Sequence, residues 1–327
     1  MDPRAPLTED EAAEFAVRFR ALADSVNGFI QGKASVVDLA LTCLLAEGHL
    51  LVEDVPGVGK TSLARSIAGS LGASWQRIQF TPDLLPSDVT GVSVYHQGTG
   101  EFAFHPGPVF AHVVLADEIN RASPRTQSAL LEVMEERTVT VDGAPNNVPR
   151  PFIVIATQNP VEMDGTYPLP EAQLDRFMMK TSLGYPDRSA ETAVLAQHHA
   201  GRKVADVSSV SDAEHVATMV ATAESVHVAP SVMDYVVRLV SATREHPQVR
   251  LGASPRGSVN LLRSTRVRAA SLGRPYVVPG DVQELALPVL GHRIVADPAV
   301  EARGGGVADV VSEIVEGTPA PQGSFVG

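Results

Sequence analysis

The stretch Glu53 to Ser62, EDVPGVGKTS, places a glycine-rich loop directly before a lysine and a threonine. The residues HLLV before it are typical of a strand, and Leu63, Ile67 and Leu71 after it share one face of a helix. A loop between a strand and a helix N-terminus presents backbone N–H groups without helical partners and the positive end of a dipole. The stretch therefore predicts a phosphate-binding loop.

Within this loop, we expect Lys60 to reach the outer phosphates of a nucleotide and the Thr61 hydroxyl to ligate Mg²⁺. The common pattern is G-x-x-x-x-G-K-[ST], and Asp54 stands where its first glycine is expected. An ordinary turn with a surface lysine is the alternative, but the flanking strand and helix favour phosphate binding. The residues predicted to hold the nucleotide are Gly57, Val58, Gly59, Lys60, Thr61 and Ser62.

Two acidic residues, Asp117 and Glu118, end the apolar run HVVLA. The carboxyl ends of parallel strands face the ligand, so we expect both acids to point toward the phosphates near Lys60. Asp117 would hold Mg²⁺ through water, and Glu118 would polarise a water for attack on the γ-phosphate. A second buried strand, PFIVIAT, ends before Asn159, whose amide can hydrogen-bond both the water and a phosphate oxygen.

These residues require a parallel sheet between helices to bring them together. Short strand-like segments alternate with helical ones from about Glu47 to Gly184, which predicts an α/β domain over residues 1–184. Two turn-rich intervals, Thr81–Phe110 and Arg137–Arg150, predict β-hairpins. Beyond GYPDR, five helical segments predict an all-helical domain over residues 185–300. From Arg303 onward, glycine and proline predict a frayed tail, residues 301–327.

Composition excludes several protein classes. The 327-residue chain is 44% hydrophobic and carries a net charge of −12, which is unfavourable for general nucleic-acid binding. Seven arginines between Arg244 and Arg274 are interpreted as a solvated helix and subunit-contact surface. There is no apolar run long enough to span a membrane and no apolar signal core, and Cys43 is the single cysteine. These features favour a cytoplasmic protein.

Six motifs in order resemble the MoxR family of AAA+ ATPases over about Asp10 to Pro298: DVPGVGKT, DEINR, ATQNP, LPEAQLDRF, GYPDR and GASPR. The resemblance implies a P-loop AAA+ core followed by a helical lid, and it explains Asp54 as the family's own form of the loop. It implies that the intervals Thr81–Phe110 and Arg137–Arg150 are the helix-2 and pre-sensor-1 insertions.

The resemblance also implies roles that spacing alone does not give. Arg176 in LDRF matches the arginine finger, which completes the nucleotide site of a neighbouring subunit and offsets charge during phosphoryl transfer. Arg256 in GASPR matches the sensor-2 arginine, acting either within its own subunit or across the interface. Ile30 and Gly32 match the segment near adenine.

The function that follows is Mg²⁺-dependent ATP hydrolysis in a homo-oligomeric ring, a hexamer, that matures or remodels a protein client. The resemblance suggests a client with a von Willebrand factor A domain. The AAA+ subunit of a metal chelatase is the nearest alternative, and a nucleotide-gated scaffold without turnover is a second. A DNA-remodelling ATPase ranks lower, since Arg137 and Arg150 are the only cations of their interval.

Overall fold

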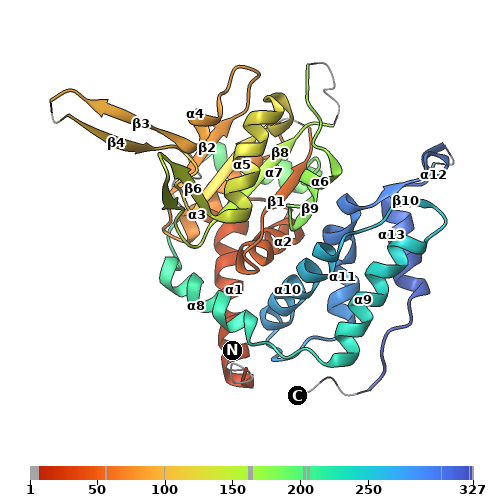
Figure 1. Cartoon of the computed structure of the whole chain (residues 1–327). Helices are drawn as coiled ribbons and strands as arrows, with labels where there is room; N and C mark the ends of the chain where they lie inside the picture. Colours follow the sequence, from red (N-terminus) through yellow and green to blue (C-terminus); the bar gives the residue numbers. More distant parts are fainter. Residues whose placement is uncertain are drawn as a thin grey trace.

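The core of the protein is a five-stranded parallel sheet with the strand order β2-β5-β8-β1-β9 (Figure 1). The computed structural model describes residues 7–55, 57–98, 100–160, 165–201, 204, 207–302, 304–323 and 325. The strands are β1 (Leu50–Glu53), β2 (Trp75–Gln79), β5 (Val113–Asp117), β8 (Ile153–Gln158) and β9 (Met179–Thr181). Every pairing between them is parallel, so all five carboxyl ends lie at one edge, as predicted.

Both faces of the sheet are buried, because successive side chains of a strand point to opposite faces. Leu50 and Val52 belong to the core cluster formed with α1 (Glu9–Asn27), α2 (Ala34–Leu45) and α3 (Lys60–Ser70). Leu51, between them, belongs to the cluster on the other face, formed with α5 (Pro124–Glu136). Strands buried on both sides read as continuous apolar runs, which is how these segments appear in the sequence.

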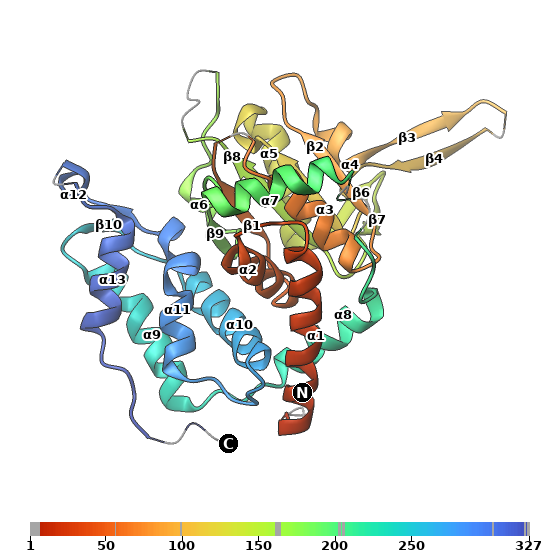
Figure 2. The ribbon, with the colours of Figure 1, turned by 180° about the vertical axis from the view of Figure 1, so that it is seen from behind.

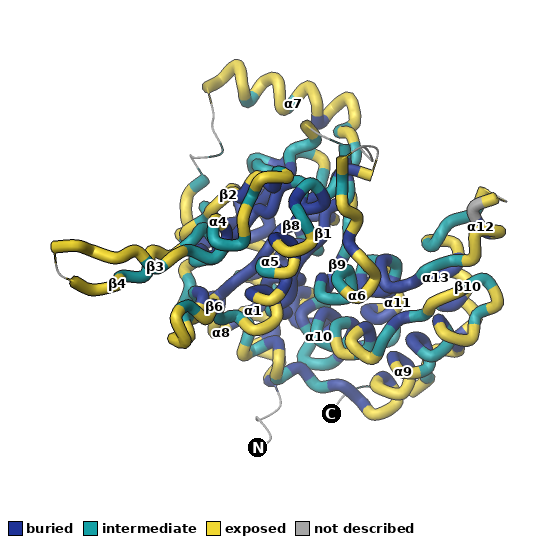
Figure 3. The backbone as a smooth tube through the Cα atoms, turned by 45° about the horizontal axis from the view of Figure 1, so that its top comes forward, coloured by how far each residue is buried: buried dark blue, intermediate teal, exposed yellow. Residues whose placement is uncertain are grey.

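Both predicted hairpins are present. The first consists of β3 (Gly91–His96) and β4 (Glu101–Pro106), which follow α4 (Pro86–Thr90) and project far from the sheet (Figure 1). The second consists of β6 (Thr138–Val141) and β7 (Ala144–Asn147), and its turn lies at Asp142 and Gly143, both with positive φ. Most of the first hairpin is exposed (Figure 3).

The C-terminal region is mainly helical, as predicted. Helix α7 (Arg188–His199) lies across the α/β core, and α8 (Ala213–Glu224) contacts α1 and α2 (Figure 2). A helical group follows, made of α9 (Pro230–Glu245), α10 (Pro255–Ser271), α11 (Pro279–Leu290) and α13 (Val307–Gly317). Two short elements also occur in this region, α12 (Pro298–Ala302) and the 3₁₀ turn η3 (Gly291–Arg293). The α/β domain contains two others, the 3₁₀ turn η1 (Ile119–Arg121) after β5 and α6 (Glu171–Leu174) before β9.

Two details of the prediction were wrong. Residues 301–327 are not simply a frayed tail, because α13 buries Val310, Val311 and Ile314 against α9 and α11. Apolar residues at helical spacing outweigh the flanking glycines and prolines.

The helical region also contains an antiparallel pair, β10 (Val249–Leu251) and β11 (Val295–Ala296). Arg303, Ser324, Val326 and Gly327 lie outside the described residues. In the described part of the chain, no helix is both long and apolar enough to cross a bilayer.

A buried arginine joins the helical group to the sheet. Arg293 has a side chain only 1% exposed, and its guanidinium donates to the carboxylate of Asp175 at 2.9 Å. It also donates to the backbone carbonyls of Asp175, Phe177 and Met178, which lead into β9. Ser254, the residue that caps α10, donates its hydroxyl to the same Asp175 carboxylate at 2.9 Å. Asp175 therefore fixes α10 and η3 to the segment before β9.

Arg293→Met should destabilise the fold strongly. The change leaves Asp175 in a largely buried place without its main counter-charge, a loss of about 3–5 kcal/mol in the free energy of unfolding. Urea unfolding followed by circular dichroism measures this. Arg18→Met is the matched control: Arg18 pairs with Glu14 at the surface, 38% and 62% exposed, so it should cost less than about 1 kcal/mol. Equal losses in both variants would contradict the role given to Arg293.

Candidate active site

The predicted phosphate loop joins β1 to α3, as the sequence indicates. Gly57 and Gly59 have φ of 87° and 104°, a left-handed conformation that favours glycine, and α3 begins at Lys60. The Lys60 side chain is buried, and its ammonium donates to the backbone carbonyl oxygen of Asp54 at 3.0 Å. Its charge is therefore held over the loop, where a phosphate at the α3 N-terminus would lie.

The unusual Asp54 has a structural task at the end of β1. Its buried carboxylate accepts hydrogen bonds from the backbone N–H groups of Leu183 and Gly184, the latter at 2.8 Å, and from the Ser182 hydroxyl at 3.1 Å. These three residues follow β9. A glycine at position 54 would leave their donors without this acceptor, so aspartate here connects the phosphate loop to the start of the helical region.

Asp117 ends β5 and is 8% exposed. Its carboxylate accepts a hydrogen bond from the Thr157 hydroxyl at 2.6 Å and pairs with Arg77 of β2, also at 2.6 Å. Sequence reasoning missed both partners. Arg77 lies opposite Leu115 on the neighbouring strand. This pairing depends on strand order and register, which the sequence alone does not predict.

Glu118 follows Asp117 in a left-handed conformation, with φ of 57°. Its backbone N–H donates to the Thr157 hydroxyl at 2.9 Å. Its carboxylate accepts from the Gln79 amide at 2.7 Å and pairs with Arg121 at 3.0 Å. Gln79 and Arg121 therefore fix the orientation of the predicted water-activating acid, and sequence reasoning had given neither of them a role.

Asn159 comes directly after β8 and is 8% exposed. Strand β8 is the neighbour of β1, and the two stay paired up to Glu53 and Gln158. The backbone N–H of Asp54 then donates to the carbonyl of Gln158 at 3.1 Å. The ends of β1, β5 and β8 are thus adjacent, and the structure brings the loop, Asp117 and Asn159 to one edge of the sheet.

A cavity of about 580 Å³ lies beside the loop. It is bounded by Gly57 to Gly59, by the segment around Ile30, and by α7. Gly32, with φ of 71°, packs so closely under α7 that an added Cβ would come within 2.9 Å of Ala190. Sequence reasoning found Ile30 and Gly32 but missed Phe29 beside them and the lining that α7 and its approach supply: Tyr185, Val194, Leu195 and His198.

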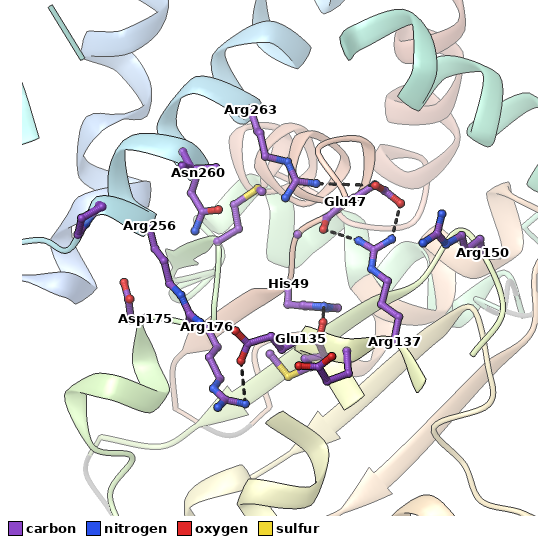
Figure 4. A pocket seen from close by; sticks show the side chains of 16 residues that line it. Glu47, His49, Glu135, Arg137, Arg150, Asp175, Arg176, Arg256, Asn260 and Arg263 are labelled. Atoms are coloured by element: carbon purple, nitrogen blue, oxygen red, sulfur yellow. Dashed lines mark hydrogen bonds and ion pairs between the residues drawn. The ribbon is translucent and has the colours of Figure 1, made fainter. Parts of the chain in front are cut away.

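Arg176 and Arg256 lie together but not at this edge. Arg176 precedes β9, and Arg256 lies in the first turn of α10. Both side chains pair with one carboxylate, that of Glu135 near the end of α5 (Figure 4). Glu135 follows Met134, whose carbonyl oxygen is 2.9 Å from the ring Nε2 of His49, and His49 immediately precedes β1. The two arginines therefore lie at the amino ends of β1 and β9, and the phosphate loop follows the carboxyl end of β1.

The length of the sheet separates Arg176 and Arg256 from the phosphate loop, and side chains are too short to span it. At about 3.3 Å per residue, a strand of the six residues of β8 is roughly 20 Å long. A second cavity, about 660 Å³, lies at the arginine end and is lined by neither the loop nor the acids of β5. Five arginines border it, Arg137, Arg150, Arg176, Arg256 and Arg263 (Figure 4).

Acidic residues compensate part of this positive charge. Arg137 pairs with Glu47, and Arg263 lies 3.8 Å from the same carboxylate. Burial lowers the pKa of Arg263, although the negative charge of Glu47 opposes that shift. Burial also lowers the pKa of His49 to about 4, so this ring is neutral at pH 7 and links β1, α5 and β8 by hydrogen bonds.

The carboxyl edge has the donor set that a magnesium nucleotide needs. Mg²⁺ takes oxygen ligands, usually one or two from the protein together with phosphate oxygens and waters. Asp117 offers a buried carboxylate, and Thr61 offers a hydroxyl in the first turn of α3. Among the described residues, no group of three His, Cys, Asp or Glu side chains could hold a metal alone. These residues fit an ion that arrives with the nucleotide.

Comparison with known proteins gives a consistent result. Residues 49–179 match the ATPase family associated with various cellular activities (AAA), and residues 241–314 match the AAA lid domain. The uncharacterized protein YeaC of Bacillus subtilis is 48% identical over 298 residues, 91% of this chain and 93% of its own length. Chaperone MoxR1 of Mycobacterium tuberculosis is 43% identical over 296 residues, 88% of this chain and 78% of its own.

A solved structure agrees with the fold. A crystal structure of a protein described as an ATPase from Cytophaga hutchinsonii superimposes with a TM-score of 0.89 at 36% identity, covering 96% of this chain and 98% of that one. The parallel sheet with its helices and the helical lid are thus parts of one known architecture. The chain belongs to the MoxR family of AAA+ ATPases and is an ATP hydrolase.

Proposed function

We propose that the chain hydrolyses ATP in a ring of identical subunits, with each active site built from two of them. One subunit would supply Lys60, Thr61, Asp117, Glu118 and Asn159, and its neighbour would supply Arg176 and Arg256. The observation that supports this proposal is the position of the two arginines at the edge of the sheet opposite the phosphate loop. Charges so placed can assist phosphoryl transfer only in another subunit.

Within such a site, each side chain has a separate task. The Lys60 ammonium and the N-terminal N–H groups of α3 would bind the β- and γ-phosphates. Thr61 and Asp117 would hold Mg²⁺, which neutralises charge on the phosphate oxygens. Glu118, oriented by Gln79, would take the proton of the attacking water, and Asn159 would position that water. The arginines of the neighbour would offset the charge that develops on the phosphoryl group.

The cavity beside α7 is proposed as the place of the adenine base. Ile30 offers an apolar side chain, and Gly32 lets α7 approach closely enough to form the opposite wall. A flat aromatic ring fits a mainly apolar cavity of this kind.

The energy of hydrolysis is proposed to drive remodelling or maturation of a protein client in the cytoplasm. The relative MoxR1 is named a chaperone, which supports a protein client. The β3–β4 hairpin exposes apolar side chains that could contact such a client: Val92, Val94, Tyr95 and Phe102, the last two with rings 5.1 Å apart. Family resemblance suggests a client with a von Willebrand factor A domain. The buried single cysteine accords with a reducing compartment.

The alternatives have less support. The relatives favour the MoxR family over a chelatase subunit. A scaffold without turnover has no use for an acid held in place as Glu118 is by Gln79 and Arg121. A DNA-remodelling role would need cations on the second hairpin, and Arg137 is already paired with Glu47.

Mixing two inactive variants tests the shared site. Arg176→Ala and Glu118→Gln should each lower kcat at least about a hundredfold, since each removes a group that acts in the transition state. In mixed rings, an Arg176→Ala subunit beside a Glu118→Gln subunit forms one intact site. Random mixing should restore about a quarter of the wild-type rate of phosphate release.

Arg20→Ala, at an exposed position of α1, is the control and should keep the wild-type rate. A mixture that stays inactive, although co-purification proves that both variants assemble together, would contradict the shared site.

The ATP affinity of a single subunit should depend on the carboxyl edge of the sheet and not on the amino edge. Arg256→Ala should leave ATP affinity of the dilute monomer within about twofold of wild type, because Arg256 lies away from its own loop. Lys60→Ala should weaken the same affinity by at least about a hundredfold through loss of a buried cation. Titration with a fluorescent ATP analogue measures both. Equal weakening by the two changes would place Arg256 in its own subunit's site.

The hairpin and the client are tested together. Glu118→Gln should retain a von Willebrand factor A-domain partner in an ATP-dependent pull-down, because the arrested nucleotide state persists. Adding Tyr95→Ser and Phe102→Ser to this variant should remove that retention while the thermal midpoint of unfolding stays unchanged, since both side chains are exposed. Retention that does not depend on ATP, or on these two residues, would exclude the proposed role of the hairpin.

A further inference from the structure

We call Arg176 and Arg256, which one subunit is proposed to supply to its neighbour, the arginine half-site. Glu135 is the acidic residue that pairs with both of them. Its carboxylate lies 3.2 Å from the Arg176 guanidinium and within hydrogen-bond distance of the Arg256 guanidinium (Figure 4). The three side chains are 34%, 31% and 49% exposed, so they border the cavity rather than forming part of the core. Resemblance to a family motif assigns a role to each arginine but none to Glu135.

The backbones of the two arginines are already held as one unit. Asp175, the residue before Arg176, accepts hydrogen bonds from Ser254 and from the buried Arg293. Ser254 caps α10, and its hydroxyl also accepts from the backbone N–H of Arg256 at 3.1 Å. The segment before β9 and the start of α10 are therefore held by the same carboxylate, which leaves the orientation of the long side chains still to be fixed.

Glu135 removes that remaining freedom. Arg176 also donates to the carbonyl oxygen of Leu131 at 2.8 Å, so α5 holds its guanidinium at two points one turn apart. Two guanidinium groups brought together repel each other, and a carboxylate between them offsets that repulsion. Each guanidinium carries five N–H donors, which is more than these contacts use, so both can keep Glu135 and still donate to phosphate oxygens.

We propose that Glu135 is a positioning residue that aligns Arg176 and Arg256 as a preorganised pair for the γ-phosphate of the neighbouring subunit. This inference rests on the proposed function, since it deepens the role of the same half-site. An aligned pair loses little side-chain entropy when a phosphate arrives, and electrostatic stabilisation that needs no reorganisation is the most effective kind. Glu135 touches no substrate in this scheme and acts only through the arginines.

Glu135→Gln tests the proposal with little change of shape. It should lower kcat about tenfold, the effect expected when a charge-assisted hydrogen-bond pair is weakened, while KM for ATP stays within about twofold. Glu136→Gln is the matched control. Glu136 is the next residue, it is exposed, and in the described part of the chain its side chain makes no hydrogen bond or ion pair. It should keep the wild-type kcat. Differential scanning calorimetry should give both variants the wild-type midpoint.

A mixing experiment distinguishes alignment across the interface from a defect inside one subunit. Rings made from equal amounts of Glu135→Gln and Glu118→Gln should exceed the rate of either variant alone, about two- to threefold above Glu135→Gln, because some sites combine two intact halves. A defect confined to the nucleotide half of the Glu135→Gln subunit would instead give a rate below that of Glu135→Gln alone.

The outcomes separate this inference from the function on which it rests. Full activity of Arg176→Ala would overturn the shared site itself. An inactive Arg176→Ala together with a Glu135→Gln rate equal to that of Glu136→Gln would overturn only the role of Glu135. A Glu135→Gln rate above wild type would also overturn it, because the carboxylate would then restrain the arginines rather than align them.

Discussion

The direction of the sheet is the constraint on which the rest of the structure depends. All five strands are parallel, so every carboxyl end lies at one edge and every amino end at the other. The phosphate loop, Asp117 and Asn159 lie at carboxyl ends, whereas Arg176 precedes an amino end. A single subunit consequently carries two chemically different edges, one suited to bind a magnesium nucleotide and one rich in arginine. This division makes oligomerisation a requirement of the proposed chemistry.

Two carboxylates, the buried Asp54 and the partly buried Asp175, connect these edges to the helical region. At the carboxyl edge, Asp54 binds the residues that follow β9, and at the amino edge Asp175 binds Arg293 and the cap of α10. A change in the phosphate loop thus has a direct mechanical connection to the segment leading into α7. At the amino edge, the segment that carries Arg176 is joined through the carboxylate of Asp175 to α10 and to Arg293 of the helical group. We infer that movement of the helical group would carry Arg256 and the segment of Arg176 together.

Local signals in the sequence were sufficient for much of this description. Strand and helix alternation predicted the sheet, Asp142-Gly143 predicted the turn of the second hairpin, and the spacing around Lys60 predicted the phosphate loop. Partners that depend on strand order and register were not predictable in this way. Arg77 contacts Asp117, and Gln79 contacts Glu118, only because β2 lies beside β5 in the sheet. The contacts of Glu135 were likewise not predictable, since its two partners, Arg176 and Arg256, lie far from it in the chain. Helix α13 was missed because glycines and prolines flank its apolar face.

The central claim is that each active site is completed by the arginine edge of a second subunit. The most direct measurement is a structure of the assembled protein with a nonhydrolysable ATP analogue and Mg²⁺. The account predicts the Arg176 guanidinium within hydrogen-bond distance of a γ-phosphate held by Lys60 of the adjacent subunit, with Glu135 still bound to it. Nucleotide sites that are fully enclosed by one chain, with Arg176 and Arg256 facing solvent, would contradict it.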